Sequence, residues 1–395
     1  MKCIGYLSAA PRVSTRPDAE ASGPRSHVLG VINGFRNSGW HVRSFIVGDR
    51  MAVKVLKKNT ESMLSKSKLH ALLADVVRFG MGVVNARRAL GELDDEVHWV
   101  YERFAALQSL GWIFKRKGIP WILETNAPLF YEAKVERKSL VLTKLARKLE
   151  ISAYHKCDVL ICVTEELKNI IIRETGIDPG KVIVVPNGVD VLVYDPQKYR
   201  AKRLFAEFTV GFVGSVISWQ GLNLLLTAIK ELQEEGVFIR AVIVGDGPAR
   251  GEWQQLAEEL GLSEYTKFVG RVPATEVPEY ISGFDICYSG QLPLKIGVMY
   301  LSPLKLYEYM AMAKPVIASN FADAGKLVKN GVTGYLFEPG NLEALMSCLR
   351  EAYAAGGNLV EMGRAAREQI VQEHSWESRV RMMIPQIEEI LGRKV

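Results

Sequence analysis

The feature that most constrains the fold is an alternation of short apolar runs with stretches of helical periodicity, which passes through the chain in two successive sets. Short apolar runs separated by helix-length segments indicate βα units, whose strands pair in parallel sheets. The first set predicts strands at Cys3–Ser8, His41–Ile46, Val97–Val100, Pro120–Glu124, Asp158–Val163 and Lys181–Val185, and helices at Arg25–Asn37, Phe104–Lys117 and Glu165–Glu174. The second predicts strands at Phe208–Val213, Phe238–Val244, Thr266–Val269, Asp285–Ser289, Pro315–Ala318 and Thr333–Phe337, and helices at Gln220–Leu232, Gly251–Leu260, Glu276–Ser282, Pro303–Met312 and Leu342–Tyr353. We therefore expect an α/β protein with two Rossmann-like domains that face each other.

A turn and a polar segment separate the two sets. Pro186-Asn187-Gly188 is a typical turn sequence, and the Pro- and Lys-containing segment Asp195–Lys202 follows it. At 395 residues the chain is long enough for two domains of ordinary size. The sequence thus predicts an N-terminal domain over residues 1–198, a C-terminal domain over residues 199–375 and a final amphipathic helix over residues 376–395. The segment Ala9–Pro24 is expected to be a loop at the cleft between the domains.

The composition disfavours several classes of protein and site. The five cysteines are scattered and form no C-x-x-C arrangement, which argues against a disulfide framework or a zinc site and for a reducing cytoplasm. No uninterrupted apolar run approaches the roughly 18 residues that a membrane-spanning helix needs. No paired carboxylates and no cluster of metal ligands are evident, so we expect neither a bound metal nor a cofactor.

The net charge of +6 is unevenly distributed, because residues 1–198 hold 30 Lys and Arg against 21 Asp and Glu, whereas the remainder is slightly acidic. The densest basic stretches are Lys54–Lys68 and Lys134–Lys148. The second has apolar residues at helical spacing, so it is either a helix that lies on the anionic inner face of a membrane or an ordinary surface helix. Nucleic acid is disfavoured as a partner, since the basic residues are not interleaved with regularly spaced aromatic residues.

The helix start at Ser302 carries the strongest indication of chemistry. Serine followed by proline is a helix-start pattern, so we expect Ser302 to cap the helix and Pro303 to take its first position. The backbone N–H groups of Leu304 and Lys305 would then point outward at the positive end of the helix dipole, which suits a diphosphate. Lys305 adds a full charge there, and Glu308 lies on the same face, where its carboxylate can accept hydrogen bonds from a ribose diol. The alternative is a capped helix on which Lys305 and Glu308 simply pair at the surface.

Glycines after two expected strands point to the same kind of ligand. Gly214 and Gly221 flank one βα turn, and Gly245 and Gly247 follow another strand. Without side chains, such turns allow the backbone to approach a phosphate closely, although glycine also marks ordinary turns. Arg271 follows a further strand and either flanks the nucleotide or is a surface arginine.

Together these segments resemble the family-4 retaining glycosyltransferases of the GT-B fold, in a subgroup with a Ser-Pro-x-Lys-x-x-Glu donor motif. Residues 302–319 (SPLKLYEYMAMAKPVIAS) are similar to the signature helix of that family and the strand after it. Further similar segments follow in order over almost the whole second half: Val184–Asp190, Phe212–Ser215 with Trp219–Gly221, Val244–Pro248, Val269–Val272 and His374–Trp376. The resemblance implies that the final helix packs towards the first domain and that the donor contacts Gly214, Ser215, Trp219, Gly221, Gly245, Gly247, Arg271, Val272, Ser302, Pro303 and Leu304, with Lys305 and Glu308 at the reaction centre.

The sequence departs from the family pattern at three positions. The family has two glutamates with seven residues between them, but here Tyr300 stands in place of the first. The basic pair that serves the diphosphate is replaced by Ser215 and Gln220. Lys305, together with Lys295 or an arginine of the first domain, would therefore supply the positive charge, and an inactive relative stays open as an alternative.

The first half resembles the acceptor domain of the family less strongly. Gly23 and His27 lie where the family has a glycine-containing loop near the diphosphate. Glu124 and Asn126 follow an expected strand, at the end where ligands of parallel sheets bind, and can face the transferred sugar or the acceptor, as can Glu132. Tyr101–Phe104 follows another expected strand at the same end, so Arg103 is a further candidate for the cleft. The alternatives are that His27 packs locally at a helix start and that Glu102 and Arg103 form an internal ion pair.

The predicted activity is the transfer of a sugar from a nucleoside diphosphate sugar, most simply a UDP- or GDP-sugar, with retention at the anomeric carbon. The acceptor is left open among sugars, lipid-linked molecules and small metabolites of polysaccharide, glycolipid or other glycoconjugate synthesis. A GT-B epimerase, a phosphorylase and a non-catalytic sugar-nucleotide binder are the alternatives. A nicotinamide dehydrogenase is disfavoured, because neither the turn after Ser8 nor the segment Val244–Arg250 has the Gly-x-Gly-x-x-Gly pattern.

Overall fold

The computed structural model describes residues 2–19, 22–51, 68–93, 97–129, 140–294 and 297–392. The chain forms two compact units. The first comprises Met1–Ala19, Pro24–Pro186 and Trp376–Val395, and the second comprises Glu20–Gly23 and Asn187–Ser375. The N-terminal part of the first unit thus ends at Pro186, earlier than the junction expected at residue 198. The C-terminal segment from Trp376 onwards also belongs to the first unit.

The first unit is built on a six-stranded parallel sheet with the strand order β2-β1-β3-β4-β5-β6. Its strands are β1 (Cys3–Ser8), β2 (His41–Ile46), β3 (Trp99–Arg103), β4 (Trp121–Thr125), β5 (Val159–Cys162) and β6 (Val182–Val184). Its helices are α1 (Gly23–Asn37), α4 (Lys68–Leu93), α5 (Trp112–Arg116), α7 (Thr143–Lys156), α8 (Glu165–Thr175) and α16 (Trp376–Leu391).

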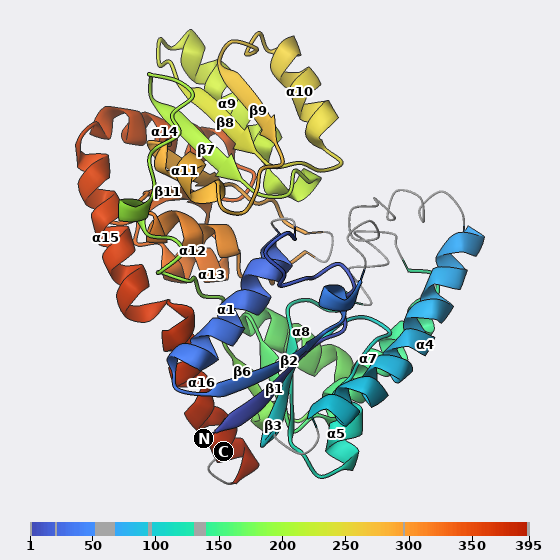
Figure 1. Cartoon of the computed structure of the whole chain (residues 1–395). Helices are drawn as coiled ribbons and strands as arrows, with labels where there is room; N and C mark the ends of the chain where they lie inside the picture. The colour runs from blue at the N-terminus through green and yellow to red at the C-terminus, as the bar shows by residue number, and fades with distance from the viewer. Residues whose placement is uncertain are drawn as a thin grey trace. The chain divides into compact units, whose positions relative to one another are not determined.

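Strand order places the helices of this unit on two faces of its sheet. The chain passes from β1 to β2 in one direction and from β2 through β3 to β6 in the other, and right-handed crossovers put the corresponding helices on opposite faces. Figure 1 shows α4, α5 and α7 on one side and α1 with α16 on the other. The final helix packs closely on α1, because a Cβ atom on Gly30 would lie only 1.9 Å from the indole nitrogen of Trp376. The expected return of the last helix to the first half of the chain is confirmed.

The second unit is built on another six-stranded parallel sheet, with the strand order β12-β11-β10-β7-β8-β9. The strands are β7 (Thr209–Val213), β8 (Arg240–Val244), β9 (Thr266–Gly270), β10 (Ile286–Ser289), β11 (Val316–Ser319) and β12 (Gly334–Phe337). The helices are α9 (Leu222–Glu234), α10 (Arg250–Glu259), α11 (Val277–Ser282), α12 (Leu304–Ala311), α13 (Ala322–Leu327), α14 (Leu342–Ala355) and α15 (Asn358–Glu373). Helices α9, α10 and α14 cover one face, where α14 packs on α9, and α12 packs with α15 on the other (Figure 1).

The predicted α/β class with two Rossmann-like sheets is confirmed, but one predicted helix is largely wrong. Of the helix expected at Phe104–Lys117, only Trp112–Arg116 is α-helical. The buried carboxylate of Glu102 accepts hydrogen bonds from the backbone N–H groups of Leu110 and Gly111, at 2.6 and 2.8 Å, and holds the preceding segment as a loop. Leu107 in that loop has a left-handed φ of 65°, which a helix does not allow.

The structure also has a 26-residue helix that the sequence pattern does not indicate, α4. It carries apolar side chains on its outward face as well as its buried face, so the contrast that marks an amphipathic helix is blurred. The basic stretch Lys54–Lys68 lies outside the described residues except for its last residue. The basic stretch Lys134–Lys148 is described only from residue 140, and its helix, α7, begins at Thr143.

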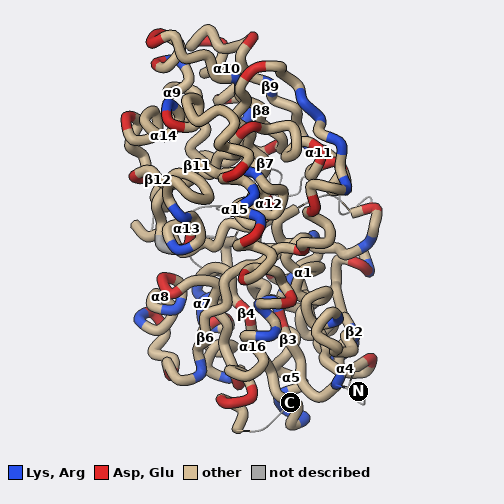
Figure 2. Tube along the Cα trace, turned by 90° about the vertical axis from the view of Figure 1, so that its left-hand side faces the viewer, with Lys and Arg blue, Asp and Glu red and all other residues tan. Residues whose placement is uncertain are grey.

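Acidic and basic residues are interspersed over both units (Figure 2). All five cysteines lie within the described residues, where they are buried and form no disulfide. In the part of the chain that is described, no helix has the length and apolar character needed to cross a membrane. Within the same residues, no group of three or more His, Cys, Asp and Glu side chains is arranged to hold a metal ion.

Candidate active site

The donor residues expected from the sequence lie at the switch point of the second sheet. Strands β7 and β10 are neighbours, but the chain leaves β7 towards α9 on one face and β10 towards α12 on the other. The carboxyl ends of two such strands border a crevice in which open α/β sheets bind ligands. The turn at Gly214 follows β7 and the start of α12 follows β10, so the sequence motifs meet at this point.

Lys305 is the cation of this site. Its ammonium group donates a hydrogen bond to Oε1 of Gln220 and lies 4.2 Å from the ring centre of Phe212. It also lies 3.6 Å from the position that a Cβ atom would take on Gly214. Burial lowers the pKa of Lys305 to about 7, although the charge of Glu308 opposes this shift. An anion that enters the site would restore the charged form.

Gln220, which replaces the lysine of the family pattern, is therefore the direct partner of Lys305. It is 7% exposed and belongs to the short turn just before α9. A second lysine here would repel Lys305, whereas the amide oxygen accepts a hydrogen bond from its ammonium group. Nothing in the sequence indicates this contact, since the two residues are 85 positions apart.

The glycine turns pack against one another through bare backbone. A Cβ atom on Gly245, whose φ is 132°, would lie 1.9 Å from the carbonyl oxygen of Gly214. A Cβ atom on Gly221, with φ at 64°, would lie 2.0 Å from the carbonyl oxygen of Gly290. A Cβ atom on Gly247 would likewise lie 2.2 Å from the carbonyl oxygen of Val216. The turns after β7 and β8 therefore need glycine at these positions, because a Cβ atom would strike main-chain carbonyl groups.

The expected cap of α12 is wrong in its detail. The N-cap position is held by Pro303, without a side-chain cap, and the helix begins at Leu304. The hydroxyl of Ser302 instead accepts a hydrogen bond of 3.1 Å from the backbone N–H of Asn187, whose side chain donates to the Ser302 carbonyl at 2.5 Å. This long-range pairing competes successfully with local capping. The first N–H groups of α12, at Leu304 and Lys305, still precede the first intrahelical bond and need an acceptor.

Glu308 lies one turn along α12 from Lys305. Burial raises its pKa to about 7, while a hydrogen bond from Tyr194 and the charge of Lys305 act in the opposite direction. Tyr194, which no sequence motif singles out, is thus part of the site. Tyr300, which replaces the first glutamate of the family pattern, is 1% exposed.

The remaining donor candidates occupy the border of the site. Arg271 is more than half exposed and pairs loosely with Asp246, at 3.8 Å. Val272 packs on an apolar cluster of the second unit, and Trp219 is half-buried with its carbonyl accepting a bond from the backbone of Leu292. Ser215 is exposed. Lys295, an expected source of charge, lies outside the described residues.

The first unit holds a second group of expected residues around Glu124, at the end of β4. One oxygen of its carboxylate accepts hydrogen bonds from Nε2 of His27, at 2.6 Å, and from the amide of Asn126, at 2.7 Å. The other accepts from the hydroxyl of Tyr101 at 2.7 Å. Burial by itself raises the pKa of Glu124, but His27, Arg103 and Tyr101 together lower it to about 2. Glu124 is therefore an ionised group that fixes its neighbours, and it is not placed as a free base.

His27 is a functional candidate because one of its ring atoms is still available. It begins the buried side of α1, and its ring packs edge-on against Trp376 at 5.0 Å between centres. Its Nδ1 atom is buried and has no hydrogen-bond partner among the described residues. The hydroxyl groups of Tyr6 and Ser8, both in β1, are likewise buried without a hydrogen-bond partner among the described residues. Gly23 is the first residue of α1.

The ion pair expected between Glu102 and Arg103 is not formed. Adjacent residues of a strand point to opposite faces of the sheet, so their side chains diverge. Glu102 binds the loop before α5, and burial raises its pKa to about 7. Arg103 contributes its charge to the side that holds Glu124. Glu132 lies outside the described residues.

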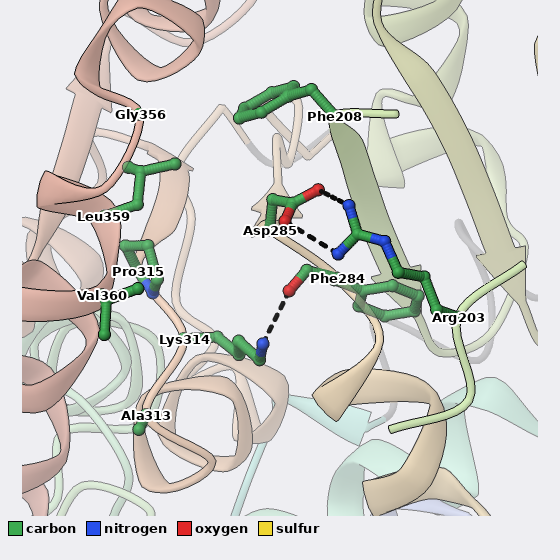
Figure 3. A pocket seen from close by; sticks show the side chains of 10 residues that line it. All are labelled: Arg203, Phe208, Phe284, Asp285, Ala313, Lys314, Pro315, Gly356, Leu359 and Val360. Atoms are coloured by element: carbon green, nitrogen blue, oxygen red, sulfur yellow. Dashed lines mark hydrogen bonds and ion pairs between the residues drawn. The ribbon is translucent and has the colours of Figure 1, made fainter. Parts of the chain in front are cut away.

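A cavity of about 380 Å³ in the second unit lies away from these residues (Figure 3). Its lining includes Phe208, Asp285 and Pro315, which precede β7, β10 and β11, so it lies at the amino ends of the strands. Arg203 binds Asp285 through two hydrogen bonds of 3.0 and 2.8 Å, and Lys314 donates to the carbonyl of Phe284 at 2.7 Å. The charged groups of this cavity thus have partners within the unit, and the carboxyl-end site is the better candidate.

Comparison with known families matches both halves of the chain. The family described as Glycosyltransferase Family 4 matches residues 21–191, and the family described as Glycosyl transferases group 1 matches residues 207–355. Together the two matches cover most of the sequence.

Individual relatives are distant. A 2-deoxystreptamine glucosyltransferase of Streptomyces kanamyceticus is 22% identical over 63% of this chain and 65% of its own length. A GDP-mannose-dependent phosphatidylinositol monomannoside mannosyltransferase of Mycolicibacterium smegmatis is 24% identical over 74% of this chain and 76% of its own. The chain therefore matches about two thirds to three quarters of the length of these relatives.

Solved structures share the fold over nearly the whole chain. Sucrose-phosphate synthase from Thermosynechococcus elongatus superposes with a TM-score of 0.73 at 17% identity, over 99% of this chain and 100% of that one. Anabaena Alr3699/HepE in complex with UDP and glucose superposes with a TM-score of 0.66 at 16% identity, over 98% and 100%. The fold is GT-B, as the sequence predicted.

Proposed function

Since the chain belongs to glycosyltransferase family 4, a retaining family, we propose that it transfers a sugar from a nucleoside diphosphate sugar to an acceptor with retention at the anomeric carbon. The observation that carries the proposal is the place of Lys305. Its ammonium group lies against the Gly214 turn at the switch point of the second sheet, on the helix whose first N–H groups precede any intrahelical bond. A cation and N–H groups that need an acceptor, together at one helix start, are what a diphosphate requires.

The chemical step needs stabilisation of the negative charge that grows on the departing diphosphate. Lys305 and the first N–H groups of α12 are fixed before the reaction begins, so they can meet this charge without reorganising. Gln220 acts as a positioning residue, because its amide oxygen directs the ammonium group of Lys305. Glu308, which is held by Tyr194, is assigned to the ribose of the nucleotide. Gly214, Gly221, Gly245 and Gly247 give the phosphates access to the backbone, and Ser215, Trp219, Arg271 and Val272 border the donor.

The first unit is proposed to hold the reacting sugar or the acceptor. Glu124 fixes the ring of His27 and the amide of Asn126, so that Nδ1 of His27 and the remaining polar atoms of Asn126 can bind hydroxyl groups. Arg103 adds a positive charge at the end of β3. These roles need neither a metal nor a redox cofactor.

The donor is proposed to be a UDP- or GDP-sugar. A GDP-mannose-dependent relative and a structural relative with bound UDP represent the two bases. The acceptor is proposed to belong to polysaccharide, glycolipid or other glycoconjugate synthesis, with the protein in the cytoplasm or at the inner face of the membrane. The mycobacterial relative, whose name specifies a phosphatidylinositol mannoside, gives a precedent for a lipid acceptor.

A panel of UDP-, GDP-, ADP- and dTDP-sugars, screened by thermal shift, tests the donor assignment. A ligand at a hundred times its dissociation constant stabilises the native state by about 2.7 kcal/mol, which is readily measured. The matching donor is then followed with and without candidate acceptors, and in the presence of EDTA. Turnover that depends on an acceptor and persists in EDTA supports the proposal.

Three other outcomes would contradict it. Release of an epimer or free sugar without an acceptor indicates an epimerase, and a requirement for orthophosphate indicates a phosphorylase. A donor that binds but is never consumed indicates a non-catalytic sugar-nucleotide binder.

A further inference from the structure

The outward face of the first unit carries a cluster of exposed apolar side chains that no core requires. Six of the large exposed apolar residues lie on α4, with Leu73 at 56% and Val77 at 61% exposure, and two lie at or near the start of α7. The full set is Leu73, Val76, Val77, Phe79, Met81 and Val84 on α4, with Val141 and Leu145. We call these eight residues the α4–α7 patch. A single exposed apolar residue is ordinary, but several on neighbouring segments favour an interaction surface.

The two helices form one rigid support for this patch. The carboxylate of Asp75, on the buried side of α4, accepts hydrogen bonds from the backbone N–H groups of Val141 and Leu142, at 2.8 and 2.9 Å. Asp75 thereby fixes the segment that leads into α7 against α4. Figure 1 shows α4 and α7 together at the outer edge of the first unit. Val141 is thus held next to α4, and both segments expose apolar side chains.

Among the described residues of α4 and α7, the exposed charges that lie beside these apolar residues are positive. Lys144 and Lys148 are exposed on either side of Leu145 on α7, and Arg87 and Arg88 are exposed one turn beyond Val84 on α4. The carboxylates of the two helices do not offset them. Asp75 is buried and bound to Arg78, Glu92 pairs with Arg50, and Glu150 is buried with its carboxylate bound by Tyr154.

From this combination we infer that the α4–α7 patch docks on an anionic phospholipid bilayer. An apolar stripe flanked by Lys and Arg lies in the plane of such an interface, with the apolar side chains below the headgroups and the cations among the lipid phosphates. A second copy of the chain fits less well, because a symmetric contact would bring the same basic residues face to face. At about 39 Å, the length of a 26-residue helix, α4 offers a long contact line.

Sedimentation of the full-length protein with lipid vesicles tests the inference. We expect the protein to pellet with vesicles of phosphatidylcholine and phosphatidylglycerol, to stay in solution with phosphatidylcholine alone, and to be released by salt. Each Lys near an anionic surface is worth about 1 kcal/mol, so the double substitution Lys144→Gln and Lys148→Gln should weaken partitioning by about 30-fold. Leu73→Ser with Val77→Ser should weaken it by roughly tenfold or more, because two apolar side chains no longer leave water.

A matched control is available on α15, where Val360 and Val371 are similarly exposed on the other unit. Val360→Ser with Val371→Ser should pellet like the unmodified protein. The inference would be overturned if the unmodified protein fails to bind anionic vesicles at low salt. It would also be overturned if the variant with Leu73→Ser and Val77→Ser pellets as fully as the unmodified protein. A concentration-dependent dimer that is lost in the same variant would also overturn it and assign the patch to self-association. The lysine pair is exposed, so its variant decides the matter if the apolar variant folds poorly.

Discussion

Lys305→Met is the substitution that tests the proposed reaction most directly. Methionine keeps a flexible apolar chain over the ring of Phe212, where the ammonium group now lies 4.2 Å from the ring centre, and removes only the charge and its hydrogen bond to Gln220. Loss of one preorganised donor to a developing charge costs roughly 2.7–4 kcal/mol, or a factor of about 10² to 10³ in rate. We expect a loss of that size in kcat/KM for donor turnover.

The protonation state of Lys305 changes this magnitude only slightly. With a pKa of about 7, the side chain is charged in about half of the free molecules at neutral pH. Selecting the charged half costs roughly 0.4 kcal/mol on binding, which is small beside the loss above. Because the diphosphate gains charge as the sugar departs, most of the effect should fall on kcat, with a smaller increase in KM.

Steady-state kinetics with the donor identified in the ligand panel, together with thermal unfolding, checks the prediction. The melting temperature should stay the same or rise, since an ammonium group that is unfavourably buried has been removed. Lys230→Met, on α9, is the matched control, because Lys230 makes a surface ion pair with Glu234 at 3.1 Å and should not affect turnover. A Lys305→Met protein that folds normally and retains kcat/KM within a few-fold of the original would refute the proposed role of the cation.

Three further predictions concern pH and backbone geometry. Donor affinity should fall as pH rises through about 7, because Lys305 then loses its proton. Titration calorimetry should find this fall weaker in Lys305→Arg, which stays charged, whereas Glu308, whose pKa is also about 7, titrates in both proteins; an equal fall in both would contradict the role of Lys305. Gly245→Ala should lower the free energy of unfolding, measured by urea denaturation, by roughly 2 kcal/mol or more, because its methyl group would lie 1.9 Å from the carbonyl oxygen of Gly214. An unchanged urea concentration at the midpoint of unfolding would contradict the close packing of these turns. The pKa of Glu124 is about 2 in the folded protein against an ordinary value of 4.5, so its ionised carboxylate contributes about 3 kcal/mol to the free energy of unfolding above pH 4.5. This contribution is lost as pH falls towards 2, so the difference in stability between the original protein and Glu124→Gln should shrink over that range. A constant difference would contradict the ionised state of Glu124.

Local patterns determined much of the fold. The strands can be placed to within a few residues because a buried parallel strand needs a short apolar run, and this requirement is visible in any window of the sequence. The helix start before Lys305 and the glycines at 214 and 221 stand out for the same reason, since turn and helix-start preferences depend on neighbouring residues. The loop before α5 escapes such patterns because a carboxylate from a neighbouring strand, Glu102, holds it.

The partners within each site were decided only by tertiary structure. Right-handed crossovers and strand order bring β7 beside β10, so Gln220 contacts Lys305. No local sequence pattern at either residue predicts this contact. In the same way Glu124 binds His27, and Ser302 binds Asn187 in place of capping its own helix. Likewise, the sequence of α4 shows no regular alternation of apolar and polar residues that would distinguish its outward face. The exposed apolar residues of α4 can be recognised only from the structure, which shows which face of the helix is buried. Periodicity is a property of neighbours in sequence, whereas these contacts join residues that only the packed sheet makes neighbours in space.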